Sequence, residues 1–329
     1  MNVLVIGGAG YIGSHAVNIL IKKGYTVSVL DNLVTGHRDA VAKDATFFEG
    51  DIRDKEILNQ IMQEQQIEAI FHFAASSLVG ESVEKPLKYF NNNVVGMEVL
   101  LEAMKENDVK KIIFSSTAAV YWDVQEPLIT EDLPKAPTSP YGESKLMIEN
   151  MIKWCDLAHG IKFVSLRYFN VAGALSTGEI GEDHDPETHL IPIVLQTALG
   201  QRDVITIFGD DYNTPDGTCI RDYVHVEDLI EAHVLSLEYL NANTESQIFN
   251  LGSSTGYSVK EIVEAARKVT GEEIPAKIGE RRAGDPAKLV ASSEKARETL
   301  GWQPKYDNVE DIIQTAWDWH KSNPEGYAD

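Results

Sequence analysis

Short apolar runs alternate with longer amphipathic stretches along the first half of the chain. The amphipathic stretches repeat their apolar positions at helical spacing, and the apolar runs have the length and composition of buried strands. The expected strands cover residues 2–6, 26–30, 46–48, 69–73, 111–114 and 162–167. Regular alternation of this kind predicts an α/β fold, a Rossmann-type doubly wound parallel sheet with helices on both faces.

This regularity ends near residue 170, where shorter elements and more loops follow. A chain of 329 residues has room for two lobes. We therefore predict a Rossmann domain over residues 1–170 and a smaller C-terminal α/β lobe over residues 171–329. An amphipathic helix near residues 226–240 is expected to pack back on the first lobe.

A glycine-rich turn follows the first expected strand, with Gly7, Gly10 and Gly13 before an amphipathic helix. Glycines there allow a tight turn and a close approach to a pyrophosphate, and the N-terminus of the helix offers free N–H groups. The second strand is followed by Asp31, where a carboxylate can bind the ribose hydroxyls of adenosine. Because an acid at this place repels a 2′-phosphate, the pattern favours NAD over NADP.

Tyr141 and Lys145 are a candidate catalytic pair. Ser139 suits the N-cap of a helix and Pro140 its first turn, so the two residues fall on one helical face. A neighbouring ammonium lowers the pKa of a phenol, which makes the phenol usable as a general base. The alternative is a half-buried tyrosine beside a solvated lysine.

The charge balance restricts the partners of the chain. It has 29 Lys plus Arg against 51 Asp plus Glu, a net charge of -22, which disfavours nucleic acid and anionic membranes. Only two cysteines are present, Cys155 and Cys219, and no apolar run reaches the roughly 18 residues of a membrane span. A strand-like run opens the chain in place of a signal peptide, so we expect a cytoplasmic protein with neither nucleic acid nor a membrane as a partner.

The second half contains isolated cations in an acidic background. Arg221, Arg281 and Arg282 suit bidentate binding of a diphosphate, although surface salt bridges would also account for them. Phe208 could stack on a base or fill the core. The loop 181–189 is rich in His, Asp and Glu, but its spacing matches no recurrent zinc or calcium pattern, so we expect no metal.

Taken together, these motifs resemble the extended branch of the short-chain dehydrogenase/reductase superfamily and, within it, the UDP-hexose 4-epimerases. The resemblance runs along the whole chain, and the matching segments are 7–15, 31–33, 49–53, 79–82, 141–145, 167–170, 216–218, 221–223, 281–285, 317–320 and 324–327. It implies an isomerase that interconverts UDP-galactose and UDP-glucose through transient oxidation at C4 by tightly bound NAD. It also implies a homodimer, formed through the helices of Asn92 and Tyr141.

The resemblance assigns roles to individual residues. Tyr141 would be the base, Thr117 its hydroxyl partner, and Lys145 would hold the nicotinamide ribose and lower the pKa of Tyr141. NAD would contact Gly7, Gly10, Tyr11, Ile12, Gly13, Asp31, Asn32, Asp51, Ile52, Phe73, Ala74, Ala75, Asn92, Lys145 and Phe169. The UDP-sugar would contact Thr117, Tyr141, Asn170, His189, Leu190, Phe208, Arg221, Arg282, Asp285 and Leu289.

Some positions depart from the commonest family pattern. Thr117 stands where Ser is frequent, Ser77 where some members have Lys, Trp122 where Gly is usual, and His189 where Asn is frequent. In the family the position of Leu289 gates the C2 side of the sugar, and a residue smaller than Tyr there leaves room for an N-acetyl group. The resemblance therefore predicts that UDP-GlcNAc and UDP-GalNAc are also interconverted, less efficiently than UDP-glucose and UDP-galactose. The alternative is that Leu289 still fills the space.

Two other functions are consistent with the same fold. A nucleotide-sugar 4,6-dehydratase needs an acid and a base beside the active hydroxyl, but Thr117 is followed by Ala118 and Ala119. A dinucleotide-sensing protein without chemistry would have no need of Tyr141, Lys145 and Thr117 together. The catalytic epimerase is therefore the favoured hypothesis.

Overall fold

The computed structural model describes residues 1–121, 126, 128–282 and 285–328. Its strands are β1 (Asn2–Ile6), β2 (Thr26–Asp31), β3 (Thr46–Glu49), β4 (Ala69–His72), β5 (Lys111–Ser115), β6 (Lys162–Tyr168), β7 (Asn170–Ala172), β8 (Ile205–Phe208), β9 (Ile220–Arg221), β10 (Tyr223–His225), β11 (Gln247–Leu251), β12 (Tyr257–Ser258), β13 (Ala276–Gly279) and β14 (Lys288–Leu289). Its α-helices are α1 (Tyr11–Lys22), α2 (Lys55–Glu64), α3 (Val79–Glu84), α4 (Pro86–Tyr89), α5 (Gly96–Glu106), α6 (Pro140–His159), α7 (Leu190–Ala198), α8 (Val226–Ala242), α9 (Val259–Thr270), α10 (Glu294–Leu300) and α11 (Val309–Ser322). Two 3₁₀ turns, η1 (Arg38–Ala40) and η3 (Ala118–Val120), and a π-helical stretch, η2 (Phe90–Val95), complete them.

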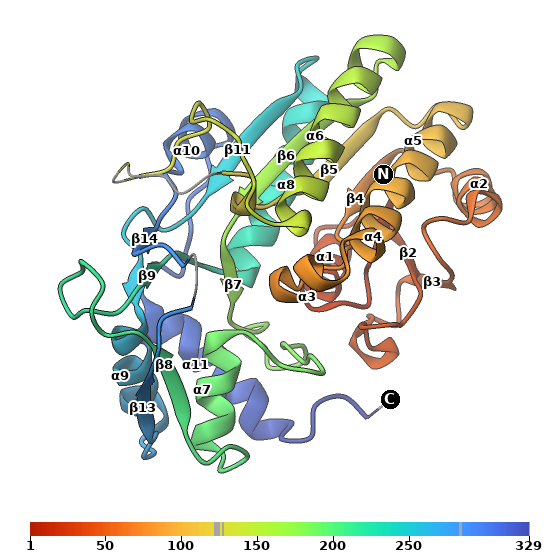
Figure 1. Ribbon diagram of the computed structural model, residues 1–329. Helices are drawn as coiled ribbons and strands as arrows, with labels where there is room; N and C mark the ends of the chain where they lie inside the picture. Colours follow the sequence, from red (N-terminus) through yellow and green to blue (C-terminus); the bar gives the residue numbers. More distant parts are fainter. Residues whose placement is uncertain (122–125, 127, 283–284, 329) are drawn as a thin grey trace.

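A seven-stranded parallel sheet forms the centre of the larger lobe, in the order β11-β6-β5-β4-β1-β2-β3 (Figure 1). The strand order reverses between β1 and β4, which are neighbours although β2 and β3 come between them in the sequence. Ligands of open α/β sheets bind at such a switch point, outside the carboxyl ends of the strands. The predicted Rossmann-type fold class is therefore confirmed.

Both faces of the sheet are buried. On β1, Val3 and Val5 pack into one apolar core, and Leu4 and Ile6 into another on the opposite face. This follows from the period of two along a strand, and it explains why the central strands are apolar throughout. Helices α1 and α8 cover the first face, while α2, α5 and α6 cover the second.

The seventh strand comes from beyond residue 170. Strand β11 pairs in parallel with β6, from Gln247 opposite Val164 to Leu251 opposite Tyr168. Helix α8 precedes β11 and packs against α1, β5 and β6. The sequence predicted six strands and a second lobe that begins at residue 171. In the structure, α8 and β11 also belong to the large lobe, and the chain reaches them only after it has passed through the small lobe.

The small lobe is built on α7, α9 and α11, which pack around a third apolar core (Figure 1). Three short sheets accompany them: β10 with β7, β13 with β8, and β12-β9-β14. Helix α9 begins in a capping box, in which Ser258 and Glu261 satisfy each other's backbone N–H groups. Among the helices described here, none is long and apolar enough to cross a membrane.

Candidate active site

The helix that carries Tyr141 begins as its sequence predicts. Ser139 is the N-cap of α6, its hydroxyl accepts the N–H of Gly142 at 3.2 Å, and Pro140 occupies the first turn. A Cβ on Gly142 would lie 2.4 Å from the backbone oxygen of Ala119. The first turn of α6 therefore lies directly against η3, the short turn that follows Thr117.

Thr117 lies close enough to Tyr141 for its hydroxyl to act on the phenol. Thr117 caps η3, and its Oγ1 accepts the N–H of Ala119 at 3.1 Å, which leaves its own hydroxyl proton for another acceptor. Burial raises the pKa of Tyr141 above its ordinary value, and the hydrogen bond with Thr117 acts in the opposite direction. The two side chains that the sequence analysis named as base and partner thus lie together at the carboxyl end of β5.

Lys145 is buried one helical turn further along α6. Its Nζ donates to the backbone oxygen of Ser115 at 2.9 Å and lies 4.9 Å from the ring centre of Phe114. Burial lowers the pKa of Lys145 to about 7, and Glu149 only partly offsets this. The effect of Lys145 on the pKa of Tyr141 stays a prediction. In this structure the amino group of Lys145 donates to a backbone carbonyl, and Thr117 lowers the pKa of the phenol.

A buried ion pair lies beneath these residues and was not foreseen from the sequence. The Arg167 guanidinium contacts both carboxylate oxygens of Glu149, at 2.8 and 2.5 Å, and both side chains are at most 1% exposed. Ser116 donates to Glu149 at 2.6 Å, and Arg167 donates to the hydroxyl of Tyr121 at 2.7 Å. Glu149 lies on α6 and Arg167 on β6, so this network fixes the catalytic helix to the sheet.

The glycine turn meets the geometric needs of a pyrophosphate site. A Cβ on Gly7, whose φ is +79°, would lie 2.6 Å from the nitrogen of Ala74, and a Cβ on Gly13 would lie 2.0 Å from the Gly7 oxygen. Gly10 is the N-cap of α1 and has no side chain to occupy the free N–H groups of the first turn. The Asp31 carboxylate accepts the N–H groups of Ala9 and Leu33, each at 2.9 Å, so it is fixed beside the turn. These features fit a dinucleotide.

Three other predicted cofactor residues are engaged close by. Asn32 donates to Asp51 at 3.3 Å, and Arg53 contacts the same carboxylate at 2.8 and 2.6 Å. These contacts, chiefly the hydrogen bond from Arg53, lower the pKa of Asp51 to about 2, so the group is a permanent anion at neutral pH. Tyr11 donates to the Gly173 oxygen at 2.6 Å, which joins α1 to the start of the second lobe.

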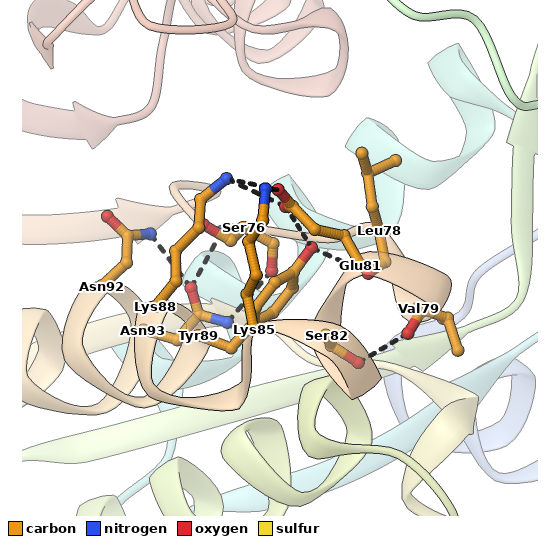
Figure 2. A network of polar contacts seen from close by, with 10 residues as sticks. All are labelled: Ser76, Leu78, Val79, Glu81, Ser82, Lys85, Lys88, Tyr89, Asn92 and Asn93. Carbon is orange, nitrogen blue, oxygen red and sulfur yellow. Dashed lines mark hydrogen bonds and ion pairs between the residues drawn. The ribbon is translucent and has the colours of Figure 1, made fainter.

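The segment after β4 is held by the polar network of Figure 2. Glu81 accepts hydrogen bonds from Lys85, Lys88 and Tyr89, and Tyr89 also donates to the backbone oxygen of Leu78 at 2.7 Å. The lysines lower the pKa of Glu81 to about 2. The network fixes α3 against α4. It therefore stabilises the segment that directly follows the predicted cofactor residues Phe73, Ala74 and Ala75.

Asn93 is a buried anchor next to Asn92, the residue that the family pattern assigns to NAD. Its side chain pairs with the N–H and the oxygen of Ser76, at 2.8 and 3.0 Å (Figure 2). It also donates to Ser144 of α6 at 3.0 Å. Asn92 is partly buried and donates to Asn93 at 3.0 Å. An Asn within an apolar stripe was the available signal, but the sequence did not distinguish the anchor from its neighbour.

The second lobe brings predicted substrate residues together in pairs. Arg221 of β9 forms an ion pair with Asp285. The guanidinium of Arg282 lies 4.2 Å above the ring centre of Phe208, which is 38% exposed. Arg281 instead contacts the backbone and carboxylate of Asp211. A half-exposed ring with a cation stacked on it can receive a base or a phosphate.

Leu289 and Asn170 link this lobe to the catalytic pair. Leu289 pairs with Arg221 in the β14–β9 ladder and packs in an apolar cluster that contains Ala118 and Phe169. Asn170 begins β7, and its amide donates to the backbone oxygen of Asp222 at 2.9 Å. Residues far apart in the sequence therefore converge beside Thr117.

His189 is the N-cap of α7, directly before Leu190. Its Nδ1 lies 2.5 Å from Glu182 Oε1, so one ring nitrogen of this predicted substrate residue is hydrogen-bonded to a carboxylate. Burial raises the pKa of Glu182, but His189 and His184 lower it more strongly. The loop between β7 and α7 thus contains a compact group of His and Glu side chains.

The remaining predicted residues pack into the apolar cores, lack a polar contact with another assigned residue, or lie outside the described part of the chain. Ile52 is buried against Gly96, while Phe73 and Ala74 pack at the edges of opposite cores. Among the described residues, no hydrogen bond or ion pair joins Ile12, Ala75 or Phe169 to another assigned cofactor residue. Trp122 and residues 283–284 of the 281–285 segment lie outside the described part of the chain.

The comparisons with known proteins agree with this fold. Residues 3–252 match the model of the NAD dependent epimerase/dehydratase family. A UDP-glucose 4-epimerase of Streptococcus mutans is 60% identical over 331 residues, covering 100% of this chain and 99% of the relative. The crystal structure of UDP-glucose 4-epimerase from Brucella ovis in complex with NAD superimposes with a TM-score of 0.94 at 47% identity, covering 96% of this chain and 97% of that one. The UDP-Glc/GlcNAc 4-epimerase of Campylobacter jejuni gives a TM-score of 0.86 at 44% identity, covering 98% and 99%.

A glycine turn that opens the first helix of a doubly wound parallel sheet is the arrangement of a nucleotide-dependent enzyme. The chain belongs to the NAD dependent epimerase/dehydratase family. The predicted family of UDP-hexose 4-epimerases and the prediction of an NAD-dependent isomerase are confirmed.

Proposed function

We propose that the chain interconverts UDP-galactose and UDP-glucose, by removing and returning hydrogen at C4 of the sugar. The observation that carries this proposal is the Tyr141–Thr117 pair at the carboxyl end of β5, one helical turn from a buried lysine. The full-length likeness to UDP-glucose 4-epimerases supports it.

The turn of Gly7, Gly10 and Gly13 receives the pyrophosphate of NAD, and Asp31 accepts hydrogen bonds from the adenosine ribose. When bound, NAD supplies a hydride acceptor that can also return the hydride. Lys145 lies on the face of α6 that would meet the nicotinamide ribose. An aliphatic amine with a pKa of about 7 can donate a hydrogen bond to a ribose hydroxyl in either protonation state.

Tyr141 acts as general base for the 4-hydroxyl of the sugar and gives the proton back when the hydride returns. Thr117 donates to the phenolic oxygen and stabilises its anionic form, which is the direction in which it already shifts the pKa of Tyr141. The buried ion pair of Glu149 and Arg167 acts through the helix, as a positioning contact.

The nucleotide half of the substrate is bound by the second lobe. Arg221 and Arg282 provide guanidinium groups for the diphosphate, and Phe208 offers a ring beside Arg282. Firm binding of UDP with few contacts to the hexose lets the oxidised sugar turn over and present its other face. Such an arrangement serves epimerisation.

The 4,6-dehydratase alternative has less support. Its elimination step needs carboxyl groups next to the active hydroxyl, whereas Ala118 and Ala119 follow Thr117. Ala118 is buried in the apolar cluster that includes Leu289. A protein that only senses a dinucleotide would not require the Thr117–Tyr141 pair.

The test is to incubate the purified chain with UDP-galactose without added coenzyme and to measure UDP-glucose. We expect sustained turnover and NAD that co-purifies with the protein, because the hydride leaves and returns within one cycle. A protein that emerges free of dinucleotide and consumes added NAD stoichiometrically would be a dehydrogenase, and the proposal would be wrong.

We further propose that N-acetylated UDP-sugars are substrates, since Leu289 is smaller than the Tyr of strict hexose enzymes. Its place beside Ala118 and Phe169, and the likeness to a UDP-Glc/GlcNAc 4-epimerase, support this. We expect Leu289→Tyr to abolish conversion of UDP-GlcNAc and to spare that of UDP-glucose. Leu289→Met, which conserves volume, should retain both. Equal N-acetyl activity in Leu289→Tyr and wild type would contradict the assignment.

A homodimer through the helices of the large lobe is also proposed. Helices α3, α4 and α6 pack together and expose apolar side chains, namely Val79, Val83, Leu87, Met147, Trp154 and Leu157. An exposed apolar surface of this kind is typical of a subunit interface. We expect Trp154→Glu to convert a dimer to a monomer in light scattering at micromolar concentration, whereas Ile278→Glu on β13 leaves the dimer intact. A wild-type monomer would refute the proposal.

We assign the enzyme to the cytoplasm. Cys155 and Cys219 are both free thiols, as expected for a reducing compartment. Fractionation of the host cell with activity measurement is the direct check.

A further inference from the structure

Four side chains of metal-binding types meet in the loop between β7 and α7. Glu182, His184, Glu187 and His189 each direct one ligand atom into a group whose members all lie within 4.8 Å of one another. His189 Nδ1 is 2.5 Å from Glu182 Oε1, and His184 Nδ1 is 3.3 Å from the same oxygen. Both imidazoles lie 3.7 Å from an oxygen of Glu187. The two ring nitrogens and two carboxylates therefore surround one centre.

The burial of these groups is uneven in a way that suits an ion. The carboxylates of Glu182 and Glu187 are 3% exposed, whereas the side chains of His184 and His189 are 30% and 50% exposed. Two buried anions need compensating positive charge, and the exposed side of the imidazoles leaves a path from solvent. A bound cation would supply the charge.

The cluster is held in place by contacts outside it. Glu187 Oε1 accepts the N–H groups of Thr188 and His189, at 2.7 and 2.8 Å, which orients the carboxylate. The C-terminal tail secures the start of the loop, because Tyr327 donates its N–H to Asp183 at 2.9 Å and its hydroxyl contacts Gly181. Outer contacts of this kind keep metal ligands in position.

We propose that Glu182, His184, Glu187 and His189 bind one divalent transition-metal ion, with Zn²⁺ as the best match. Two imidazoles and two carboxylates suit Zn²⁺, which takes four such ligands in tetrahedral geometry. With bonds of about 2.0–2.2 Å, tetrahedral donor atoms lie roughly 3.3–3.6 Å apart. The separations extend from 2.5 Å, between His189 and Glu182, to at most 4.8 Å, so side-chain adjustments of about 1 Å would bring the donor atoms into this range.

The competing explanation is a cluster of His–Glu ion pairs without a metal. Two histidines face two carboxylates, as such ion pairs require. However, both imidazoles turn the same atom, Nδ1, toward one oxygen of Glu182, at 2.5 and 3.3 Å, and both lie farther from Glu187, at 3.7 Å. A third histidine, His320, is buried close enough to feel the charges of Glu182 and Glu187. Its Nε2 has no hydrogen-bond partner among the described residues, so the region is richer in imidazole than ion pairing requires.

A metal at this place would have a structural role. Four protein ligands leave no open position for a substrate, as in closed zinc sites. His189 caps α7, so the ion would tie the loop to the first turn of that helix. This inference does not depend on the reaction, and the metal could be present in an inactive chain.

The test uses the full-length purified protein, stripped with a chelator and titrated with Zn²⁺ by calorimetry. We expect one ion per chain with a Kd in the micromolar range or below. His184→Asn and Glu187→Gln should each weaken binding by about 100-fold or more, because each removes one of four ligands. Asp185→Asn, an exposed change within the same loop, should bind like the wild type.

Co²⁺ provides a second readout, since four-coordinate Co²⁺ gives intense visible absorption bands that an adventitious surface ion does not. Circular dichroism establishes that each variant is folded, and either ligand variant alone decides the matter if the other fails to fold. Absence of Zn²⁺ binding by the wild type overturns the proposal. Binding that is equal in His184→Asn, Glu187→Gln and Asp185→Asn overturns it as well, and leaves the cluster as ion pairs only.

Discussion

Replacing Tyr141 with Phe should lower turnover by about two to four powers of ten, the usual contribution of a general acid–base group. Binding of NAD and UDP should change little, because the ring remains and only the hydroxyl paired with Thr117 is lost. Single-turnover kinetics with UDP-galactose, together with equilibrium binding of UDP, measure the two effects separately. Tyr239→Phe, on α8, is the matched control. Turnover that survives in Tyr141→Phe would remove this residue from the mechanism.

The partner hydroxyl gives this prediction a pH dependence. The hydrogen bond from Thr117 lowers the pKa of Tyr141, so its removal in Thr117→Val should raise that pKa. Because the base must lose its proton to act, the acidic limb of the turnover profile should move to higher pH. Thr117→Ser, which keeps the hydroxyl, should leave the limb in place. A profile in Thr117→Val that is merely scaled down would indicate a steric role instead.

The second large effect concerns stability. Arg167→Met leaves Glu149 as a buried carboxylate without its cation, which should lower the free energy of unfolding by about 3–5 kcal/mol. Urea denaturation measures this loss. The double variant Arg167→Met with Glu149→Leu removes both charges, and we expect it to recover most of the stability.

Lys268→Met is the control for that experiment, since it breaks a pair with Glu310 whose lysine side chain is 69% exposed. Exposed pairs contribute less than about 1 kcal/mol, so this change should be nearly silent. If Arg167→Met also left the free energy of unfolding unchanged, the buried pair would not stabilise the packing of α6 against the sheet.

Local signals allowed the catalytic helix to be predicted. The cap of Ser139, the proline at the first turn and the spacing of Tyr141 and Lys145 all act within a few residues. The glycine turn is of the same kind, because the close approaches of Gly7 and Gly13 are set by one strand, one turn and one helix. Such features can be recognised without knowledge of the rest of the fold.

Other features depend on contacts between distant segments, and local patterns in the sequence do not reveal such contacts. Nothing in the sequence distinguishes Arg167 from an ordinary strand residue. Its role becomes visible only in the fold, where α6 places Glu149 against it. Burial also lowers the pKa of Lys145, and its amino group donates to the backbone oxygen of Ser115, a contact that depends on how α6 packs against β5. Spacing gave no metal signature in the loop 181–189, because its ligand types converge only when the loop is folded against the C-terminal tail.

The position of β11 has a consequence for synthesis on the ribosome. One edge of β6 can pair with β11 only when the chain has been synthesised as far as Leu251, long after β6 itself has emerged. At about 5–20 residues per second, the nascent sheet spends several seconds with that edge unpaired. An open strand edge is a template for pairing with other chains. Nascent chains that stall between the two strands should therefore be especially dependent on chaperones.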